Sequence, residues 1–416
     1  MILIAVFVSL VFLYSLVSQR LERTAVTAPI VFTAAGTLIF PVLGVPEWER
    51  SLFLRLAEVA LVLILFTGAS RTDLRILRNI RNLPVRLLST GMLLTILLGA
   101  LAALVVFRQL SLWEAGILAA ILAPTDAGLG QVIVSSPRVP LRIREALHVE
   151  AGLNDGFSVP FLMFFIALAQ AGGQTPHTGF GLAQFVVEEV GFGALVGLGI
   201  GLVGGGLLGL ARRLEWMAKS LQQLALVALP LLCVMASEPI GASMFIAAFV
   251  AGLAVQVGFQ EAGEHSVEFT QEWGQLLAFV VFFFFGMLVA RVWQQFSLAA
   301  VLYAVLSLTV VRMLPVAVAL IGTRLSRATV LFMGWFGPRG LASIVLGLVY
   351  LEQEAHLPGE SAIRLSVIMT VLISIFAHGL SAAPGIDLYA RRIAALDAGA
   401  SEHQGVEAAG TVPLTP

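Results

Sequence analysis

Five ionisable side chains lie in stretches of sequence that are otherwise apolar enough to span a lipid bilayer. Asp126, Glu150 and Asp155 fall in one region, and Arg312 and Arg339 fall in another. A charge at the centre of a membrane helix costs roughly 2.5–3.5 kcal/mol, so five without partners would cost on the order of 12–17 kcal/mol. That exceeds the net stability of most folds. We therefore expect these charges to pair, to line a wet cavity, or to carry ions and protons.

The composition is that of a polytopic membrane protein. Of the 416 residues, 59% are hydrophobic and only 12% are charged, and the mean hydropathy is +0.97. Soluble domains of this length do not combine such values. The formal net charge of −1 argues against nucleic acid as a partner. The single cysteine, Cys233, excludes a disulfide framework or a cysteine metal site and is expected to pack in the core.

The apolar stretches predict an all-α protein with about thirteen transmembrane helices, each of about 17–25 residues. The predicted spans are 1–18, 24–42, 51–69, 85–107, 111–134, 143–169, 181–210, 217–236, 239–258, 273–290, 296–322, 328–350 and 361–384. The first span lacks a basic leading segment and a small-residue cleavage site, so we interpret it as a helix rather than a signal peptide.

The basic residues between the spans predict the orientation of the chain. Arg and Lys collect on the cytoplasmic side of short loops. With the N-terminus outside, most of them fall at cytoplasmic ends, and the external ends hold only Arg50, Arg55, Arg108, Arg291 and Arg364. This pattern favours an odd number of spans and a cytoplasmic C-terminus in a multi-pass protein of the cell (inner) membrane. The segment 71–84 is predicted to be a basic surface helix.

The fifth span contains a helix breaker at its centre. In ILAAILAPTDAGLGQVIV, Pro124 removes one backbone donor and Gly128 adds a permissive position, so the helix is expected to unwind around Thr125 and Asp126. Unwound backbone at this depth lines a cavity or is buried in protein, and broken helices of transporters offer such ends to ions. Asp126 acting only as the cap of the restarting half-helix is the alternative.

The sixth span, within REALHVEAGLNDGFSVPFLMF, carries two carboxylates that point in different directions. At about 100° per residue, Glu150 and Asn154 lie on nearly one face, whereas Asp155 lies about 140° from Glu150 and stacks with Ala151. One carboxylate is therefore free to face a cavity while the other faces protein. His148 is expected to be a hydrogen-bonded interface residue rather than a site residue.

The eleventh and twelfth spans supply the positive charges. Arg312 in LSLTVVRMLPVAVAL is surrounded by apolar residues and needs a buried carboxylate, for which Glu150 is the first choice and Asp126 the second. The twelfth span holds a second break at Gly337–Gly340, which includes Arg339. Two breaks at matching places predict inverted repeats, each with one broken helix.

These motifs resemble those of the monovalent cation/proton antiporters of the NhaP and eukaryotic sodium/proton exchanger type. The matching segments are PTDA, EAGLNDG, the arginine in VVRMLPV, and GWFGPRG, supported by LILFTGASRTDLRILRN, FIAAFVAGL and FFFFGML. The resemblance covers roughly residues 20–385. Their order and spacing together are more specific than any single motif.

The resemblance implies a homodimer in which a scaffold carries a mobile ion-binding core, with a role in pH homeostasis. The scaffold would comprise residues 1–84 and 171–295, and the core residues 85–170 and 296–384. Residues 385–416 would form a short, disordered cytoplasmic tail. No cofactor is implied, and the partners would be monovalent cations, protons and the bilayer.

The resemblance also assigns roles to single residues. Asp155 would alternately bind a cation or a proton, with Asp126 and Thr125 at the crossed breaks and Asn154 orienting Asp155. The transported cation would bind at Asp155 and Asp126.

In the same assignment, Glu150 would pair with Arg312, and Arg339 would balance charge near the crossing. The chain departs from the family pattern at Ala127, Ala151 and Pro338, where relatives usually carry Pro, Ser and an apolar residue. Because Ala151 lies on the Asp155 face, a hydroxyl ligand is missing there, which bears on ion choice.

We therefore predict an antiporter and not an enzyme. Na⁺ is the expected cation, with Li⁺ and K⁺ as alternatives, and it would compete with a proton for the carboxylate of Asp155 in an electroneutral cycle. A K⁺/H⁺ antiporter or a cation channel of the same fold is the alternative, and an intramembrane aspartyl protease is a more remote one. Arg312, Arg339 and the two breaks argue against a protease.

Overall fold

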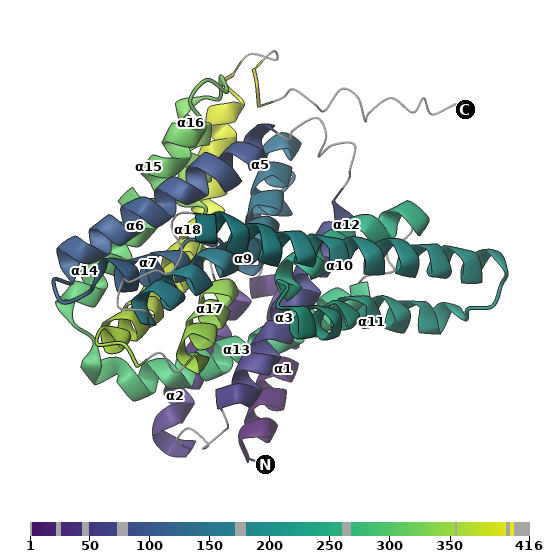
Figure 1. The fold of residues 1–416 in the computed structure, drawn as a ribbon, viewed down its shortest axis with the longest axis horizontal. Coiled ribbons are helices and arrows are strands. Elements are labelled where there is room, and N and C mark those ends of the chain that lie inside the picture. Colours follow the sequence, from purple (N-terminus) through teal and green to yellow (C-terminus); the bar gives the residue numbers. More distant parts are fainter. Residues whose placement is uncertain are drawn as a thin grey trace.

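The computed structural model describes residues 2–21, 26–43, 50–72, 82–170, 180–259, 268–353, 356–396 and 400–402. The regular elements within these ranges are helices (Figure 1). Nine helical segments of the described chain are long and apolar enough to cross a membrane, and four further apolar helices are 10–17 residues long. The predicted all-helical, multi-span fold is confirmed.

Each predicted span is occupied by one helix or by consecutive helices. The unbroken helices are α1 (Ile2–Leu21), α2 (Ala28–Leu43), α3 (Arg50–Arg71), α9 (Leu141–Gln170), α10 (Phe180–Arg213), α11 (Lys219–Ser237), α12 (Met244–Gly258), α13 (Glu268–Val292) and α18 (Glu360–Ile393). The divided spans are α5 (Asn82–Arg86), the π-helix η1 (Leu87–Gly91) and α6 (Met92–Val106); α7 (Leu112–Ile121) and α8 (Ala127–Val134); α14 (Leu298–Leu308) and α15 (Val310–Ala319); and α16 (Arg327–Trp335) and α17 (Leu341–Glu352).

Serine residues fix the first turn of several helices. Ser111, Ser243, Ser297 and Ser326 cap α7, α12, α14 and α16, and each side chain accepts a hydrogen bond from a backbone N–H in the first turn. Such a cap satisfies a donor that has no partner within the helix and contributes about 1 kcal/mol. The apolar spans therefore begin at defined residues.

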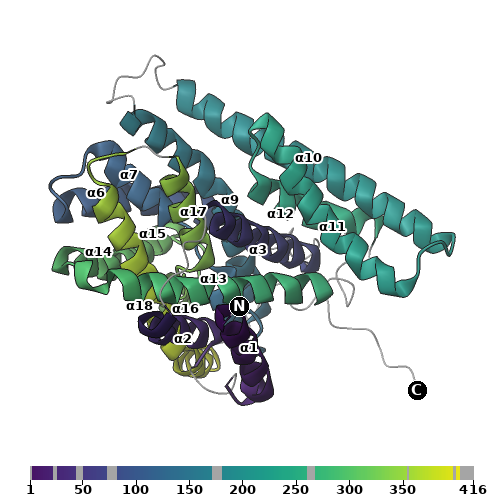
Figure 2. The same cartoon turned by 90° about the horizontal axis from the view of Figure 1, so that it is seen from below.

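One group of helices packs through glycine. In this group α2, α3, α10, α11, α12 and α13 contact one another, and α10 and α11 extend to one side of the molecule (Figures 1 and 2). Gly197, Gly201 and Gly205 of α10 lie against backbone carbonyls of α12, where a side chain would collide. The glycine-rich segment 201–211 therefore allows close packing of α10 on α12 at Gly201 and Gly205.

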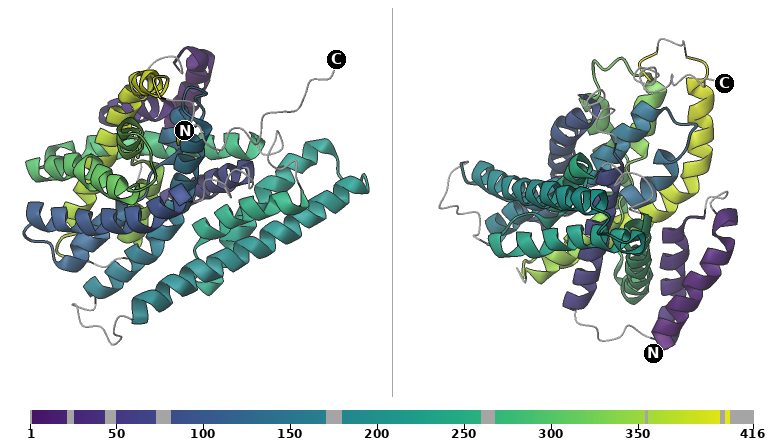
Figure 3. Two further views of the ribbon diagram at one scale, coloured as in Figure 1. Left: turned by 90° about the horizontal axis from the view of Figure 1, so that it is seen from above. Right: turned by 90° about the vertical axis from the view of Figure 1, so that its right-hand side faces the viewer.

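The second group contains the two pairs of broken helices. Here α6, α7, α8, α9, α14, α15, α16, α17 and α18 contact one another, and in Figure 3 they lie beside the first group. The boundary between the groups is formed by α9 against α10 and α12 and by α17 against α3. Gly152 and Gly156 of α9 allow the close approach, because a Cβ at either position would meet Phe249 or Ile246 of α12.

The last helix is longer than predicted. We expected a disordered tail from residue 385, but α18 continues to Ile393. Ile386, Tyr389 and Ile393 are buried on one face of this extension, and the Tyr389 ring stacks on Phe332 with centroids 4.1 Å apart. Residues 403–416 and most of the predicted basic surface helix at 71–84 lie outside the described residues.

Candidate ion-binding site at two crossed helix breaks

The two predicted breaks meet each other inside the protein. Residues 122–126 separate α7 from α8, and residues 336–340 separate α16 from α17. Each break has a proline at its third position, Pro124 or Pro338, which cannot donate to the preceding turn. The backbone N–H of Asp126 donates to the carbonyl of Pro338 at 2.7 Å. The two unwound segments are therefore hydrogen-bonded at their crossing.

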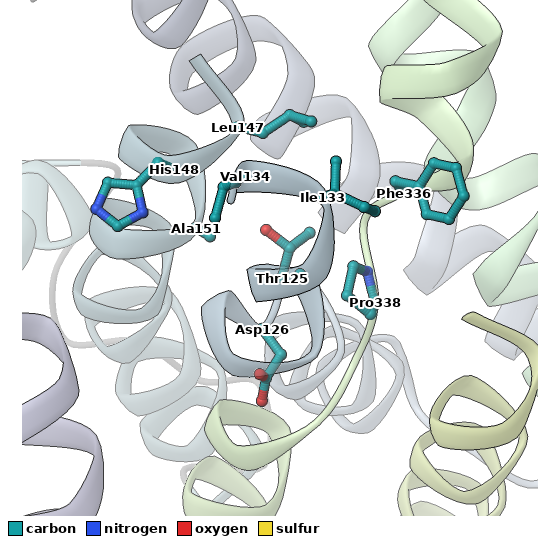
Figure 4. Close-up of a pocket in the computed structure, with 10 residues that line it drawn as sticks. Thr125, Asp126, Ile133, Val134, Leu147, His148, Ala151, Phe336 and Pro338 are labelled. Carbon is teal, nitrogen blue, oxygen red and sulfur yellow. The ribbon is translucent and has the colours of Figure 1, made fainter. Parts of the chain in front are cut away.

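The Asp126 carboxylate is held by the N-terminal ends of two half-helices. Its Oδ1 accepts from the Leu129 N–H of α8 at 2.7 Å, and its Oδ2 accepts from the Leu341 N–H of α17. Figure 4 shows the carboxylate turned toward the start of the helix that follows Pro338. A Cβ at Gly340 would collide with Oδ2, so glycine is required there. The positive ends of both helix dipoles thus stabilise a negative charge on Asp126.

Arg339 occupies the corresponding place at the C-terminal end of α7. Its side chain is fully buried, and Nη1 donates to the carbonyl of Ala123 and to that of Pro124, the latter at 2.6 Å. These carbonyls belong to the break that follows α7 and carry the negative end of its dipole. The guanidinium therefore balances charge at the crossing through the backbone.

Glu150 and Arg312 form a buried, bidentate ion pair. Arg312 Nη1 donates to Glu150 Oε1 at 2.5 Å, and Nη2 donates to Oε2 at 3.0 Å. Both residues are buried, and the guanidinium packs directly on Gly337. Arg312 therefore contacts its first-choice partner, Glu150, and not Asp126.

Asp155 differs from the other buried charges because part of its carboxylate has no partner. It is 2% exposed, and its Oδ1 makes no hydrogen bond to the described residues. We expected Asn154 to orient Asp155, but Asn154 Nδ2 donates to the Thr125 hydroxyl at 2.8 Å. Asn154 therefore ties α9 to the first break and leaves its own Oδ1 without a partner.

Comparison with known proteins places the chain in a family. The model of the transmembrane sodium/hydrogen exchanger family matches residues 4–386. The chain belongs to the sodium/hydrogen exchanger family. The chain is thus a multi-pass membrane protein. Its family is one of transporters and not of enzymes, as predicted.

Similar proteins come from yeast, bacteria and archaea. The chain is 27% identical to a probable Na⁺/H⁺ antiporter of Schizosaccharomyces pombe and 26% identical to the K⁺/H⁺ antiporter NhaP of Alkalimonas amylolytica, over 91% of its length in both cases. It spans only 54% and 65% of those two proteins. The fold matches the sodium proton antiporter MjNhaP1 of Methanocaldococcus jannaschii at pH 8 with a TM-score of 0.77 and 18% identity, covering 94% of this chain and 99% of that one.

Two cavities lead toward the crossing in this exchanger-family chain. The inner one holds about 20 Å³, room for about one water-sized group, and is lined by Thr125, Asp126 and Ala151 among others (Figure 4). The outer one holds about 240 Å³ and lies between α3, α8, α9 and α13. His148 and Val134 line both cavities, and His148 Nε2 lies 3.1 Å from the Gly68 carbonyl.

Two functional candidates on α18 were missed in the sequence. Ser374 Oγ accepts from the backbone N–H of Arg339 at 2.7 Å and lies 3.0 Å from His378 Nδ1. His378 Nε2 lies 3.0 Å from the carbonyl of Trp335, at the end of α16. Together they hold the second break in place. The available signal was the spacing of two polar residues by four in an otherwise apolar helix, which puts both on one face.

Proposed function

We propose that this chain exchanges a monovalent cation for a proton across a membrane through competition at Asp155. The observation that carries the proposal is the buried Asp155 carboxylate with an oxygen that has no hydrogen-bond partner among the described residues. A bare carboxylate in such a place is costly, so it is either protonated or bound to a cation. The two loads exclude each other, and exchange follows from that exclusion.

The surrounding charges support a fixed frame around one variable site. Asp126 is bound by two helix ends, and Glu150 is bound by Arg312. In our proposal these groups stay charged through the cycle, and Asp126, Thr125 and Asn154 shape the site without changing their load. The inner cavity beside Asp126 and Thr125 has room for a small, partly dehydrated ion.

The packing of the helices supports alternating access by movement of one group against the other. We propose that α6–α9 and α14–α18 form the mobile core, and that the remaining spans form a scaffold through which two copies of the chain dimerise. The proposed orientation places the N-terminus outside, so that the outer cavity beside Arg71 faces the cytoplasm.

Na⁺ is the cation we propose, with Li⁺ and K⁺ as alternatives. The similar antiporters differ on this point, since one is named for Na⁺ and another for K⁺. A cation channel of the same fold is the second candidate function. A channel passes cation current without obligatory proton movement, whereas the proposed exchanger couples the movement of the cation to that of the proton.

The test compares Asp155→Asn with the native protein in proteoliposomes that carry an imposed pH gradient. Addition of the preferred cation should dissipate the gradient with native protein and not with Asp155→Asn, because the amide neither titrates nor neutralises a cation. Asp387→Asn, at a half-exposed surface position, is the control. Exchange at the native rate by correctly folded Asp155→Asn would refute the assignment of Asp155.

A further inference from the structure

Three buried oxygen atoms that have no hydrogen-bond partner among the described residues lie within about one turn of α9. They are Asp155 Oδ1, Asn154 Oδ1 and Ser158 Oγ, and their residues are 2%, 3% and 0% exposed. Buried polar atoms in folded proteins are nearly always paired. Three such atoms together on one helix indicate a site for a ligand that supplies positive charge or hydrogen-bond donors.

The helix geometry places Ser158 on the face of the site. At about 100° per residue, Ser158 lies about 60° from Asp155 and about 40° from Asn154, between the two directions. Asn154 is directed to Thr125 of the first break. The Ser158 hydroxyl is therefore directed toward the crossing, one turn beyond Asp155 along α9.

The Ser158 hydroxyl does not make the hydrogen bond that helical hydroxyls of this chain commonly make. Thr67, Thr95 and Thr370 each donate to the carbonyl four residues earlier, at 2.7–2.8 Å. This local bond satisfies a hydroxyl within its own helix. The Ser158 hydroxyl has no such bond to Asn154 O and so keeps both its proton and its lone pairs available.

Ser158 also carries a hydroxyl on the helix face where Ala151 has none. Residues 151 and 158 are seven apart and lie on nearly the same face, on either side of Asp155. Ala151 has no hydroxyl. On this face of α9 the hydroxyl near Asp155 belongs to Ser158, in the turn that follows Asp155, and not to residue 151 in the turn that precedes it.

We propose that Ser158 Oγ is a ligand of the transported cation, together with Asp155 Oδ1 and Asn154 Oδ1. The inference rests on the proposed function of Asp155. A hydroxyl is both donor and acceptor. Ser158 Oγ therefore coordinates the cation in one state and accepts a hydrogen bond from the protonated Asp155 carboxyl group in the other.

The test measures the apparent KM for Na⁺, Li⁺ and K⁺ in proteoliposomes for a set of matched variants. Ser158→Ala should raise the KM for the transported cation by about five- to tenfold, the effect of losing one polar contact. Ser158→Thr keeps the hydroxyl and should stay close to native. Ala151→Ser added to Ser158→Ala should recover part of the affinity.

Ser237→Ala is the control, because Ser237 Oγ on α11 is also buried without a partner but lies away from the breaks. It should leave every KM unchanged. Cation-dependent melting of purified protein gives a second readout that does not need transport. Stabilisation by Na⁺ should fall in Ser158→Ala and return in Ser158→Thr.

The outcomes separate this inference from the proposed function. If Asp155→Asn abolishes exchange but Ser158→Ala keeps native KM values and native Na⁺ stabilisation, Ser158 is not a ligand although the function stands. An equal rise of KM in Ser237→Ala would also overturn the inference. Exchange at the native rate by Asp155→Asn would instead refute the function itself.

Discussion

Removing either member of the Glu150–Arg312 pair is expected to destabilise the protein strongly. Two hydrogen bonds to charged groups are lost, at about 1.5–3 kcal/mol each, which sums to roughly 3–6 kcal/mol. Leaving one uncompensated charge in a buried place costs about 3–5 kcal/mol by itself in comparable pairs, which agrees with that sum. Water cannot solvate the remaining charge, since both side chains are buried.

The assay is a double-mutant cycle on the melting temperature of the purified protein. Glu150→Gln and Arg312→Gln should each lower it by several degrees, because 1 kcal/mol moves a 150–250-residue domain by about 2–4 °C and a longer chain by less. The double variant should recover part of the loss, giving a coupling energy above about 1 kcal/mol. Arg312→Lys should fall between native and Arg312→Gln, because an ammonium cannot make the bidentate contact.

Arg138→Gln serves as the matched control. Arg138 pairs with Asp387, but both side chains are about half exposed, and surface pairs of this kind contribute about 0–1 kcal/mol. Strict additivity of Glu150→Gln and Arg312→Gln would refute the reasoning, since it would mean that the two charges do not stabilise each other.

Three further predictions concern charge, packing and the end of the chain. With voltage clamped by K⁺ and valinomycin, the Na⁺-driven pH change should reach the same endpoint at every potential, and a voltage-dependent endpoint would argue against one-for-one exchange. Gly156→Ala should cost about 1–3 kcal/mol in thermal stability and slow transport, because its Cβ would meet Ile246 across the boundary between the helix groups, whereas Gly199→Ala, with open space around it, should do neither. Burial raises the pKa of Glu402, but hydrogen bonds from the Ser326 N–H and the Thr329 hydroxyl outweigh it and bring the pKa below its usual value. Glu402→Gln should therefore cost about 0.5–2 kcal/mol of stability above pH 5, and the difference from native should vanish as the pH falls through that lowered pKa.

The sequence predicted those parts of the site that follow from the cost of burial. Pro124 and Pro338 each remove a backbone donor and have glycine close by, at Gly128 or at Gly337 and Gly340, so both breaks were visible within apolar runs. Arg312 cannot readily lose its proton, so a buried carboxylate had to be near it, and only a few candidates existed. These inferences need no knowledge of distances because the alternatives are too costly in hydrocarbon.

The parts that were missed depend on tertiary contacts. The Asn154 amide could donate a hydrogen bond either to Asp155 or to Thr125. Its donation to Thr125 is decided by how α9 lies against the first break. The contacts of Ser374 and His378 with the second break depend on the position of α18 beside the end of α16, which the sequence does not show. The extension of α18 had a local signal that we did not weigh, since Ile386, Tyr389 and Ile393 recur at helical spacing.

The charges at the crossing nearly cancel without Asp155. Each helix end carries about half an elementary charge, so the N-termini of α8 and α17 together offset the carboxylate of Asp126. Two carbonyls that follow α7 partly offset Arg339 in the same way, and Glu150 cancels Arg312. Asp155 is then the one of the five buried charges that lacks a fixed partner. The site is neutral only when Asp155 holds a proton or a monovalent cation. In the cycle that we propose, both loaded forms would cross the low-dielectric region with the same charge, and the empty form would be held back by its desolvation cost.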